Sequence, residues 1–400
     1  MKVNLRGAIG QSLGRVLLGI FLALWVAGMA IAEESNSSAD LDELFSASQD
    51  REVSGSAAVD PPVLPTSPEN KPSLEFSGAF KSEGGLSIGF TRWPTEEAFF
   101  SSYDGSAGAT ASLSLSMKGR PSENLFVYGS CSTSLDTTGG SGATYAWTPL
   151  ALGSIYFDYY GIPAVDIRAG TFGTTWGHGR IFTLSNLMAS SASDTTLRIS
   201  FPLVLQGLST YVTVNKAYFS GTSPTVYEYA YGALLDHIIG NLRFTEAVRY
   251  QKAEGFGVLL SIQGTVLGVD LFADGVLRGH SSLESYGFVG GLFKEINHTK
   301  FYGEYQFNST GQDHQIGLVL VQKRLFAFPV DGGLQWQHSF VDGSGRFVPG
   351  LSWGAFPHMT IQAALPIVYG AAGSQYVSNN EDPSKRRIML VLLAVIQGSF

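Results

Sequence analysis

Charged residues that alternate with apolar ones mark the positions where this chain can act on other molecules. In the segment 164–172, Asp166 and Arg168 face the side opposite to their apolar neighbours, because successive side chains of an extended strand point to opposite faces. The charged residues that alternation places on such polar faces are Asp158, Asp166, Arg168, Arg198, Arg243, Arg249 and Glu304. Mixed charges along one wall can filter solutes by charge and size. The alternative is that they are paired polar filling of a closed interior.

No catalytic motif accompanies these residues. The sequence contains no G-x-S-x-G, no H-E-x-x-H and no Gly-rich phosphate loop with a basic residue. The seven histidines occur singly, which is poor spacing for a metal site. Ser185, His178 and Asp158 have the side chains of a hydrolytic triad, but no spacing rule brings them together. The sequence therefore favours a protein that is not an enzyme and that needs neither cofactor nor metal.

The segment Ile167–Asn186 contains R-x-G, then W-G-x-G, then N. It resembles a segment of several bacterial outer-membrane porin families, in which a strand leaves the barrel wall and feeds a loop that folds inward. The resemblance implies a channel narrowed by that loop. The Gln and the Asp that usually accompany this motif are absent, so the resemblance does not identify a substrate.

We expect Gly173–Asp194 to be the third external loop and to fold into the barrel. Its piece Ile181–Met188 is apolar and has a helical pattern, and apolar surface is costly to leave in water. The loop residues then expected to line a constriction are Trp176, His178, Arg180 and Asn186. A loop folded over the outer rim is the alternative.

The last segment of the chain, from Arg386 to Phe400, predicts a closing membrane strand. Its apolar run Ile388–Ile396 is too short for a membrane-spanning helix of roughly 20 residues and suits a tilted strand of about 9–11. The alternate residues Phe400, Ile396 and Leu392 resemble the signal by which the outer-membrane barrel assembly machinery recognises such strands. Gly398 departs from that pattern. A buried strand of a soluble domain is the alternative.

From Ser73 onward, turn signals divide the chain into about 18 extended segments, within a range of roughly 16–20. The predicted strands are 74–92, 108–118, 123–133, 150–160, 163–173, 195–202, 206–216, 228–237, 240–251, 254–263, 266–276, 284–294, 297–308, 314–325, 328–340, 346–354, 357–368 and 386–400. The predicted longer links are 93–107, 134–149, 173–194, 215–227 and 369–385. Alternation of short turns with longer links is typical of membrane barrels, and an even strand count leaves both ends in the periplasm. Glu83-Gly84-Gly85 is expected to bulge or to break the first strand.

The composition agrees with a barrel. Charged residues are only 14% of the 400 residues, against the usual quarter, while there are 48 Gly, 26 Phe and 17 Tyr. Aromatic residues supply the girdles at the two membrane interfaces, and Gly supplies turns and bends. Cys131 is the only cysteine, so no disulfide can form within the chain. We expect it to pack as a small side chain in a strand, with a reactive thiol as the alternative.

Residues 1–32 are expected to be a secretory signal peptide, with the basic residues Lys2, Arg6 and Arg15, the apolar body Val16–Ala30 and a cleavage site after Ala32. Removing it leaves 22 basic against 33 acidic residues, which argues against a nucleic-acid partner.

Residues 33–72 are acidic, rich in Ser and Pro, and are expected to form a flexible periplasmic segment ahead of the barrel domain 73–400. The apolar island Leu41–Phe45 can dock as a short helix or bind a periplasmic partner. The alternative is a solvated tether.

The predicted fold is all-β: a transmembrane antiparallel up-and-down β-barrel, embedded in the lipid of the bacterial outer membrane. The predicted function is passive diffusion of small hydrophilic solutes, because about 16–18 strands leave an aqueous channel. A substrate-specific transporter and a non-conducting adhesin or structural barrel remain as alternatives. The sequence does not indicate an oligomeric state.

Overall fold

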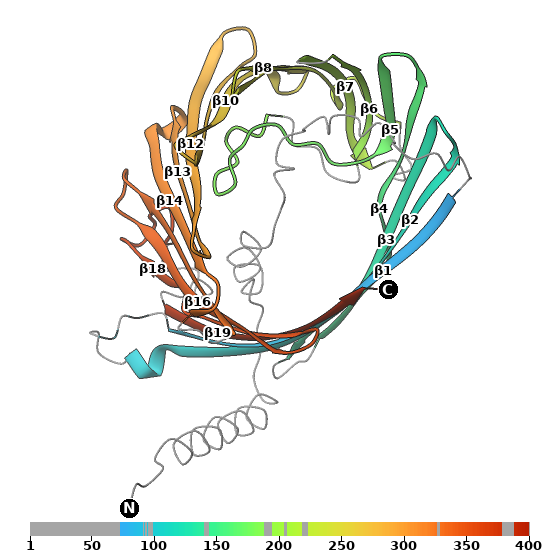
Figure 1. Ribbon diagram of the computed structural model, residues 1–400. Helices are drawn as coiled ribbons and strands as arrows, with labels where there is room; N and C mark the ends of the chain where they lie inside the picture. Colours follow the sequence, from blue (N-terminus) through green and yellow to red (C-terminus); the bar gives the residue numbers. More distant parts are fainter. Residues whose placement is uncertain are drawn as a thin grey trace, which may run out of the picture.

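The computed structural model describes residues 73–90, 92, 94, 99–139, 144–187, 194–203, 206–217, 223–325, 329–377 and 388–399. The predicted signal peptide 1–32, the segment 33–72 and Phe400 lie outside the described residues. Antiparallel strands make up almost all of the described chain and close into a ring (Figure 1). Its described residues include no helix with the length and apolar character to cross a membrane.

The strands are β1 (Ser73–Phe90), β2 (Tyr103–Ser122), β3 (Leu125–Gly139), β4 (Thr144–Ile162), β5 (Val165–Thr171), β6 (Asp194–Pro202), β7 (Gln206–Ala217), β8 (Tyr229–Ile239), β9 (Leu242–Gln251), β10 (Gly255–Val266), β11 (Val269–Gly279), β12 (Leu283–Ile296), β13 (Thr299–Asn308), β14 (Asp313–Gln322), β15 (Val330–Ser339), β16 (Gly345–Phe356), β17 (Met359–Ala364), β18 (Ile367–Tyr369) and β19 (Ile388–Ser399). Two short 3₁₀ segments, η1 (Phe99–Ser102) and η2 (Thr310–Gln312), lie in the connections.

The ring closes because β1 pairs with both β2 and β19. Ala79 lies opposite Ser399, so the first strand begins at the end of the barrel where the last strand finishes. The strands β17 and β18 share one place, since both pair with β16 and with β19. The chain therefore fills 18 barrel positions, which confirms the predicted fold class.

The predicted strand 357–368 is divided between β17 and β18 by Leu365 and Pro366. Proline has no backbone N–H and cannot donate to a ladder. Backbone hydrogen bonds to the two neighbouring strands nevertheless persist at the break. The Leu365 amide donates to the Pro349 carbonyl of β16, and the Met389 amide of β19 donates to the Pro366 carbonyl. The barrel wall is thus continuous across the break.

Polar residues face the inside of this barrel and apolar residues face the outside. Along β7, Leu208 is 39% exposed whereas the next residue, Ser209, is 0% exposed. The buried polar residues of the wall include Thr196, Ser200, Thr213, Asp274, Glu304 and Gln335. The exposed large apolar residues include Leu113, Phe157, Leu197, Leu260, Phe301 and Leu318. Such an exterior requires lipid, because water would have to hydrate a continuous apolar belt.

Tight turns join neighbouring strands at the end of the barrel where β1 begins. Two residues connect β10 to β11 and β12 to β13. Both residues of each turn, Leu267-Gly268 and Asn297-His298, have positive φ, which matches the twist of the flanking strands. This is the end that the sequence assigned to short periplasmic turns.

Two sequence predictions about the wall were wrong. The link expected at 134–149 is mostly strand, because β3 and β4 continue through it and only 140–143 lie between them. A side-chain hydroxyl adds to the pairing of the two strands here, since the Thr133 hydroxyl of β3 donates to the Thr148 carbonyl of β4 at 2.9 Å. Residues 83–85 neither bulge nor break β1, whose register with β2 and β19 is unshifted. Leu393 fills the space over Gly85, where a Cβ would lie 3.1 Å from its Cδ1 atom.

Arginine substitutions at two adjacent positions of β2 test the orientation of the wall. Leu113 faces outward and Ser114 faces the lumen. We expect Leu113→Arg to lower the free energy of unfolding in lipid vesicles by about 2–4 kcal/mol, because arginine must then enter hydrocarbon. Ser114→Arg is the matched control and should change it little. Equal losses for the two variants, measured by denaturant titration, would contradict this orientation.

Candidate functional site

The segment that follows β5 crosses the interior of the ring instead of extending beyond it (Figure 1). The structure describes this inner loop, residues 172–193, as far as Leu187. Phe172, Trp176, Phe182 and Leu187 are buried. The inward loop predicted from the sequence is therefore present.

The helix predicted for Ile181–Met188 is absent from its described part, 181–187, which consists of bends and turns. The apolar side chains of this piece contact different strands of the wall. Ile181 lies over Gly317 of β14, and Leu184 lies over Gly287 of β12. A helix presents one apolar face, whereas these side chains diverge to reach separate strands.

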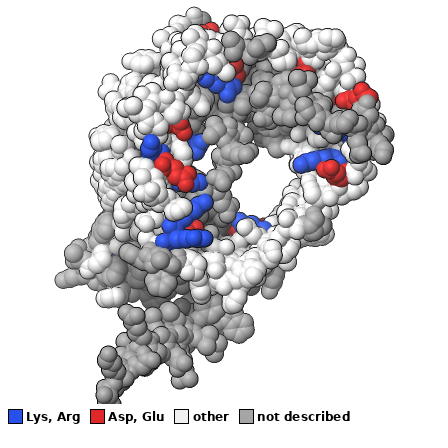
Figure 2. All heavy atoms as spheres, in the orientation of Figure 1, with Lys and Arg blue, Asp and Glu red and all other residues white. Residues whose placement is uncertain are grey.

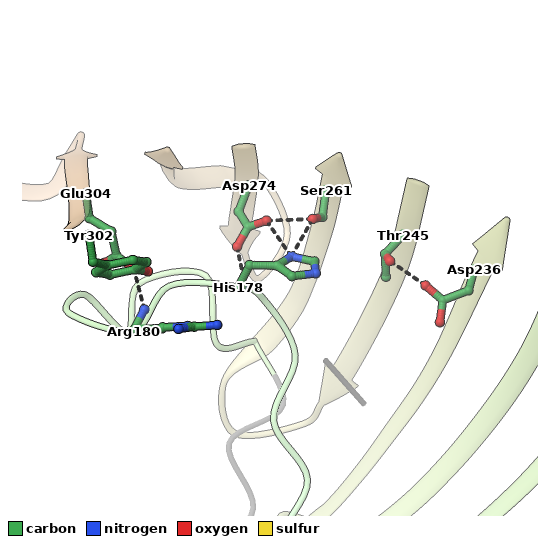
Figure 3. Close-up of polar contacts among 8 residues, drawn as sticks. All are labelled: His178, Arg180, Asp236, Thr245, Ser261, Asp274, Tyr302 and Glu304. Carbon is green, nitrogen blue, oxygen red and sulfur yellow. Dashed lines mark hydrogen bonds and ion pairs between the residues drawn. The ribbon is translucent and has the colours of Figure 1, made fainter. Parts of the chain in front are cut away.

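Glu304 of β13 holds the backbone of the inner loop. Its carboxylate, on a side chain only 2% exposed, accepts the amide N–H group of Arg180 at 2.5 Å (Figure 3). It also accepts the amide N–H groups of Ile181 and Phe182, at 2.9 Å each. The Tyr302 hydroxyl also donates to it. Charge-assisted hydrogen bonds of this kind are roughly twice as strong as neutral ones. One carboxylate thus satisfies three consecutive amides that would otherwise lie unpaired inside the barrel.

Asp274 of β11 makes the second anchor. It accepts the His178 amide at 2.6 Å and the Ser261 hydroxyl at 2.6 Å (Figure 3). The His178 Nδ1 atom lies 2.8 Å from the Ser261 oxygen and 3.1 Å from the Asp274 carboxylate. Serine and aspartate thus share one ring nitrogen, and His178 Nε2 has no hydrogen-bond partner among the described residues. In a hydrolytic triad the serine and the aspartate bind opposite nitrogens of the histidine ring, so the geometry found here does not activate Ser261.

Glycines of the wall receive the side chains of the inner loop. At each position a Cβ would overlap a loop side chain, at a distance of 2.5–2.7 Å. The pairs are Gly232 with Trp176, Gly257 with Leu187, Gly287 with Leu184 and Gly317 with Ile181. Real Cβ atoms do not approach so closely, and the interior is packed at crystal-like density. The loop is therefore seated across β8, β10, β12 and β14.

Ion pairs line the rest of the wall. Arg168 forms a two-pronged pair with Asp158, at 2.6 and 2.9 Å, and its guanidinium lies 4.4 Å from the ring of Tyr156. Arg243 pairs with Asp236 at 2.9 Å. Arg249 pairs with Glu254 at 2.7 Å. Figure 2 shows charged side chains gathered around the central opening.

The residues predicted to line a constriction take different places. Arg180 is exposed, and its guanidinium lies 5.3 Å from the ring of Tyr302. Trp176 is only 1% exposed and packs edge-on against Tyr211 of β7. The Asn186 side chain accepts the Trp176 amide at 3.1 Å, which closes the loop on itself. The predicted wall residues Asp166 and Arg198 are half-buried on β5 and β6. Their role in passage stays a prediction.

Sequence reasoning missed Asp274, Asp236, Ser261 and the four seating glycines. Asp274 and Asp236 could have been predicted to face the lumen, because each occupies a polar position within a predicted strand. Their contact with His178 could not have been predicted, since Ser261 is 83 residues and Asp274 is 96 residues from it in the sequence. Asp158, which has a side chain of the kind a hydrolytic triad uses, pairs with Arg168.

A small pocket of about 40 Å³ lies beside Arg180. The residues that line it are Arg180, Ile181, Phe293, Lys300, Tyr302, Val319, Val321 and Gln335. Two cationic side chains in so small a pocket suit a small anionic group.

The last external connection also contacts the inner wall. The Tyr376 hydroxyl donates to Gln315 of β14 at 2.8 Å. Asp342, in the connection between β15 and β16, accepts the Gln375 amide at 2.6 Å and the Ser344 hydroxyl at 2.6 Å. Although burial alone would raise the pKa of Asp342, these hydrogen bonds lower it to about 2. Asp342 therefore fastens residues 370–377 to the rim.

Comparison with solved structures identifies the architecture. The Pseudomonas aeruginosa protein OccK2 (OpdF) has a TM-score of 0.53 and 9% identity over 82% of this chain and 98% of its own. OccK9 (OpdG) of the same organism has a TM-score of 0.52 and 9% identity, over 82% and 99%. This chain has a porin-type barrel fold. Two related structures carry ligands in their names: OccK2 with glucuronate, at a TM-score of 0.52 and 10% identity over 81% and 98%, and OpdK with vanillate, at 0.51 and 9% over 82% and 99%.

No protein-family model matches this chain. No curated protein matches it either. The porin-type likeness is thus one of fold.

Removing the carboxylate of Glu304 should release the inner loop. In Glu304→Ala three amides lose their acceptor, and each hydrogen bond to a charged group is worth about 1.5–3 kcal/mol. We expect hydrogen exchange at the Arg180, Ile181 and Phe182 amides to accelerate by about 100-fold or more. Gln306→Ala, two residues along the same inner face, is the control. Unchanged exchange in Glu304→Ala would show that the loop is held by other contacts.

Acid should loosen the rim contact at Asp342. Because the pKa of this group is lowered in the folded chain, its contribution is present above about pH 4, near the ordinary value, and is lost as pH falls toward 2. We expect the protection of the Ser344 and Gln375 amides, measured relative to their intrinsic exchange rates at each pH, to fall over that window. Asp342→Asn should show faster exchange at neutral pH and no such transition. A transition that persists in Asp342→Asn would assign it to another group.

Proposed function

We propose that this chain is an outer-membrane channel for passive diffusion of small hydrophilic solutes, constricted by the inner loop. The observation that carries the proposal is the loop itself, fixed by Glu304 and Asp274 within a ring of 18 strand positions. Rings of about 16–18 strands leave an aqueous interior. The apolar exterior, the polar lining and the porin-type fold agree with this function.

Passage in this proposal involves no turnover chemistry. A solute diffuses through water past the exposed face of the loop and the charged wall. Because the loop is seated in glycine positions on four strands, the size limit is fixed by structure and does not depend on a mobile gate. Recognition of β19 by the assembly machinery remains part of the proposal; Leu392 and Ile396 face outward on that strand.

Substrate-specific uptake of small aromatic or sugar acids is a second candidate. The guanidinium of Arg180 supports it, since it lies exposed beside a small pocket and could pair with the carboxylate of such an acid. Two proteins of similar fold have been solved with glucuronate and with vanillate. A current that saturates with one such acid would favour this candidate over general diffusion.

Displacing the inner loop should widen the channel. In Gly257→Val the added side chain takes the space of Leu187, whose Cδ1 atom lies 2.5 Å from the Cβ position. We expect a larger single-channel conductance in planar bilayers and passage of larger sugars into liposomes. Gly207→Val is the control, because nothing lies within 4 Å of its Cβ position on β7.

Two results would contradict the proposal. Absence of any conductance in correctly folded wild-type protein would favour the non-conducting barrel. Equal conductance in wild type and in folded Gly257→Val would mean that the inner loop does not limit passage.

A further inference from the structure

The outward face of β9 carries a charged side chain in the middle of the membrane-spanning wall. Glu246 is exposed, whereas its neighbours Thr245 and Ala247 are buried on the lumen side. Val248 and Tyr250 continue the face of Glu246 and are exposed as well, because alternate residues of a strand share one face. The carboxylate of Glu246 therefore points toward lipid.

This placement is an exception in its part of the wall. The residues directly opposite Glu246 are Leu235 of β8 and Leu260 of β10. The outward residues that the structure describes on β7, β8, β10 and β11 include no Asp, Glu, Lys or Arg. An ionisable side chain at membrane depth is costly and marks an interaction site by default. Glu246 thus calls for a partner that can share its charge.

That partner is not found within one barrel. Glu246 makes no hydrogen bond or ion pair with any part of the chain that the structure describes. On the same outward face of β8, His237 lies two residues from Leu235 in one direction and Tyr231 four residues in the other. Diagonal neighbours in a sheet are already about 7–8 Å apart. The face therefore carries an acceptor and its donors at separate places.

The donors are available to another molecule. The imidazole of His237 stacks on the ring of Phe244, with ring centroids 5.2 Å apart and planes 9° from parallel. Its nitrogens make no hydrogen bond with the described residues. Tyr231 is 51% exposed, so its hydroxyl is open to the outside of the barrel. An imidazole N–H and a phenolic O–H can both donate to a carboxylate.

We propose that a second copy of this chain packs against the outward face of β8 and β9 and satisfies the Glu246 carboxylate. A two-fold axis along the membrane normal brings this face of both barrels together while both keep one orientation in the membrane. Glu246 of each copy then accepts a hydrogen bond from His237 of the partner subunit or from Tyr231 of the partner subunit. Each such contact occurs twice, because a two-fold interface uses the same surface on both copies.

The side chains around Glu246 suit close packing of two walls. Ala233, opposite Val248, lies diagonally from Glu246, and Gly275 lies opposite Leu260. Leu260 is 56% exposed and projects between these small residues. Association within a membrane relies on close approach at small residues and on hydrogen bonds between polar side chains, because lipid is as apolar as leucine. The face offers both.

Lipid is a poorer occupant of this face than a second copy. Acyl chains have no hydrogen-bond donors, and lipid head groups lie at the two surfaces of the bilayer. A second copy in the same membrane brings the donors and holds them at membrane depth. The dimer does not depend on conduction, so it goes beyond the proposed channel function.

Disulfide trapping in lipid vesicles tests this interface. Val248→Cys in a Cys131→Ser background places one cysteine on the proposed face. The unaltered chain is the control, because its sole cysteine, Cys131, lies opposite the outward Leu115 on a different part of the ring. After oxidation with copper phenanthroline at a low protein-to-lipid ratio, we expect the Val248→Cys protein to form the linked dimer in at least about tenfold higher yield.

The role of the carboxylate is tested by adding Glu246→Leu to the Val248→Cys protein. Leucine matches the lipid-facing residues on both sides, so the barrel is expected to fold, which unheated gels can verify. We expect the yield of linked dimer to fall to that of the control. Glu246→Gln, which keeps an acceptor oxygen, should retain more of the yield than Glu246→Leu.

Three results would overturn the proposal. Equal yields for Val248→Cys and the control would mean that the barrels meet only by chance. An undiminished yield in folded Glu246→Leu would mean that the carboxylate does not hold the copies together. Equal losses in Glu246→Gln and Glu246→Leu would exclude a hydrogen bond to residue 246. Preferential trapping in a barrel that never conducts would leave the dimer intact and refute the channel.

Discussion

A closed sheet with lipid outside and water inside can hold a loop in its lumen only if the amides of that loop find acceptors there. Glu304 and Asp274 meet this requirement, the first by accepting three consecutive amides and the second by accepting the His178 amide. Both carboxylates are almost fully buried, and each is compensated by the groups it binds. The proposed constriction and its size limit depend on these two side chains.

The barrel wall has space for the side chains of the inner loop. Glycines on alternate strands from β8 to β14 remove the side chains that would collide with the inner loop, so hydrogen bonding and packing favour one position. The opposite wall is different, because β19 is apolar on both faces. Its outer face meets lipid, and its inner face carries the buried residues Val391, Leu393 and Val395. An up-and-down barrel needs apolar residues on only one face, so β19 is an exception to that pattern.

Much of the fold could be predicted from the sequence, because period-two alternation and turn signals are local properties. The prediction 206–216 for β7 and 195–202 for β6 shows this, since each boundary agrees within one residue. The predictions for 134–149 and for residues 83–85 failed where polar strand ends and glycines resemble loops. The inner loop was predicted from its resemblance and its apolar content. Its anchors were not, because Glu304 contacts Arg180 across 124 residues of sequence and only the closed ring brings them together. The helix expected at 181–188 is absent from the described part because contacts of its side chains with separate strands of the wall override the local helical pattern.

The most direct test of a loop fixed inside the lumen is a distance between spin labels. Double electron–electron resonance would be measured on the reconstituted protein in a Cys131→Ser background, with labels at Thr183→Cys of the inner loop and Ser116→Cys of β2. The account predicts one narrow distance distribution that is the same in detergent and in lipid. A broad distribution, or one that extends beyond the width of the barrel, would show that the loop leaves the lumen.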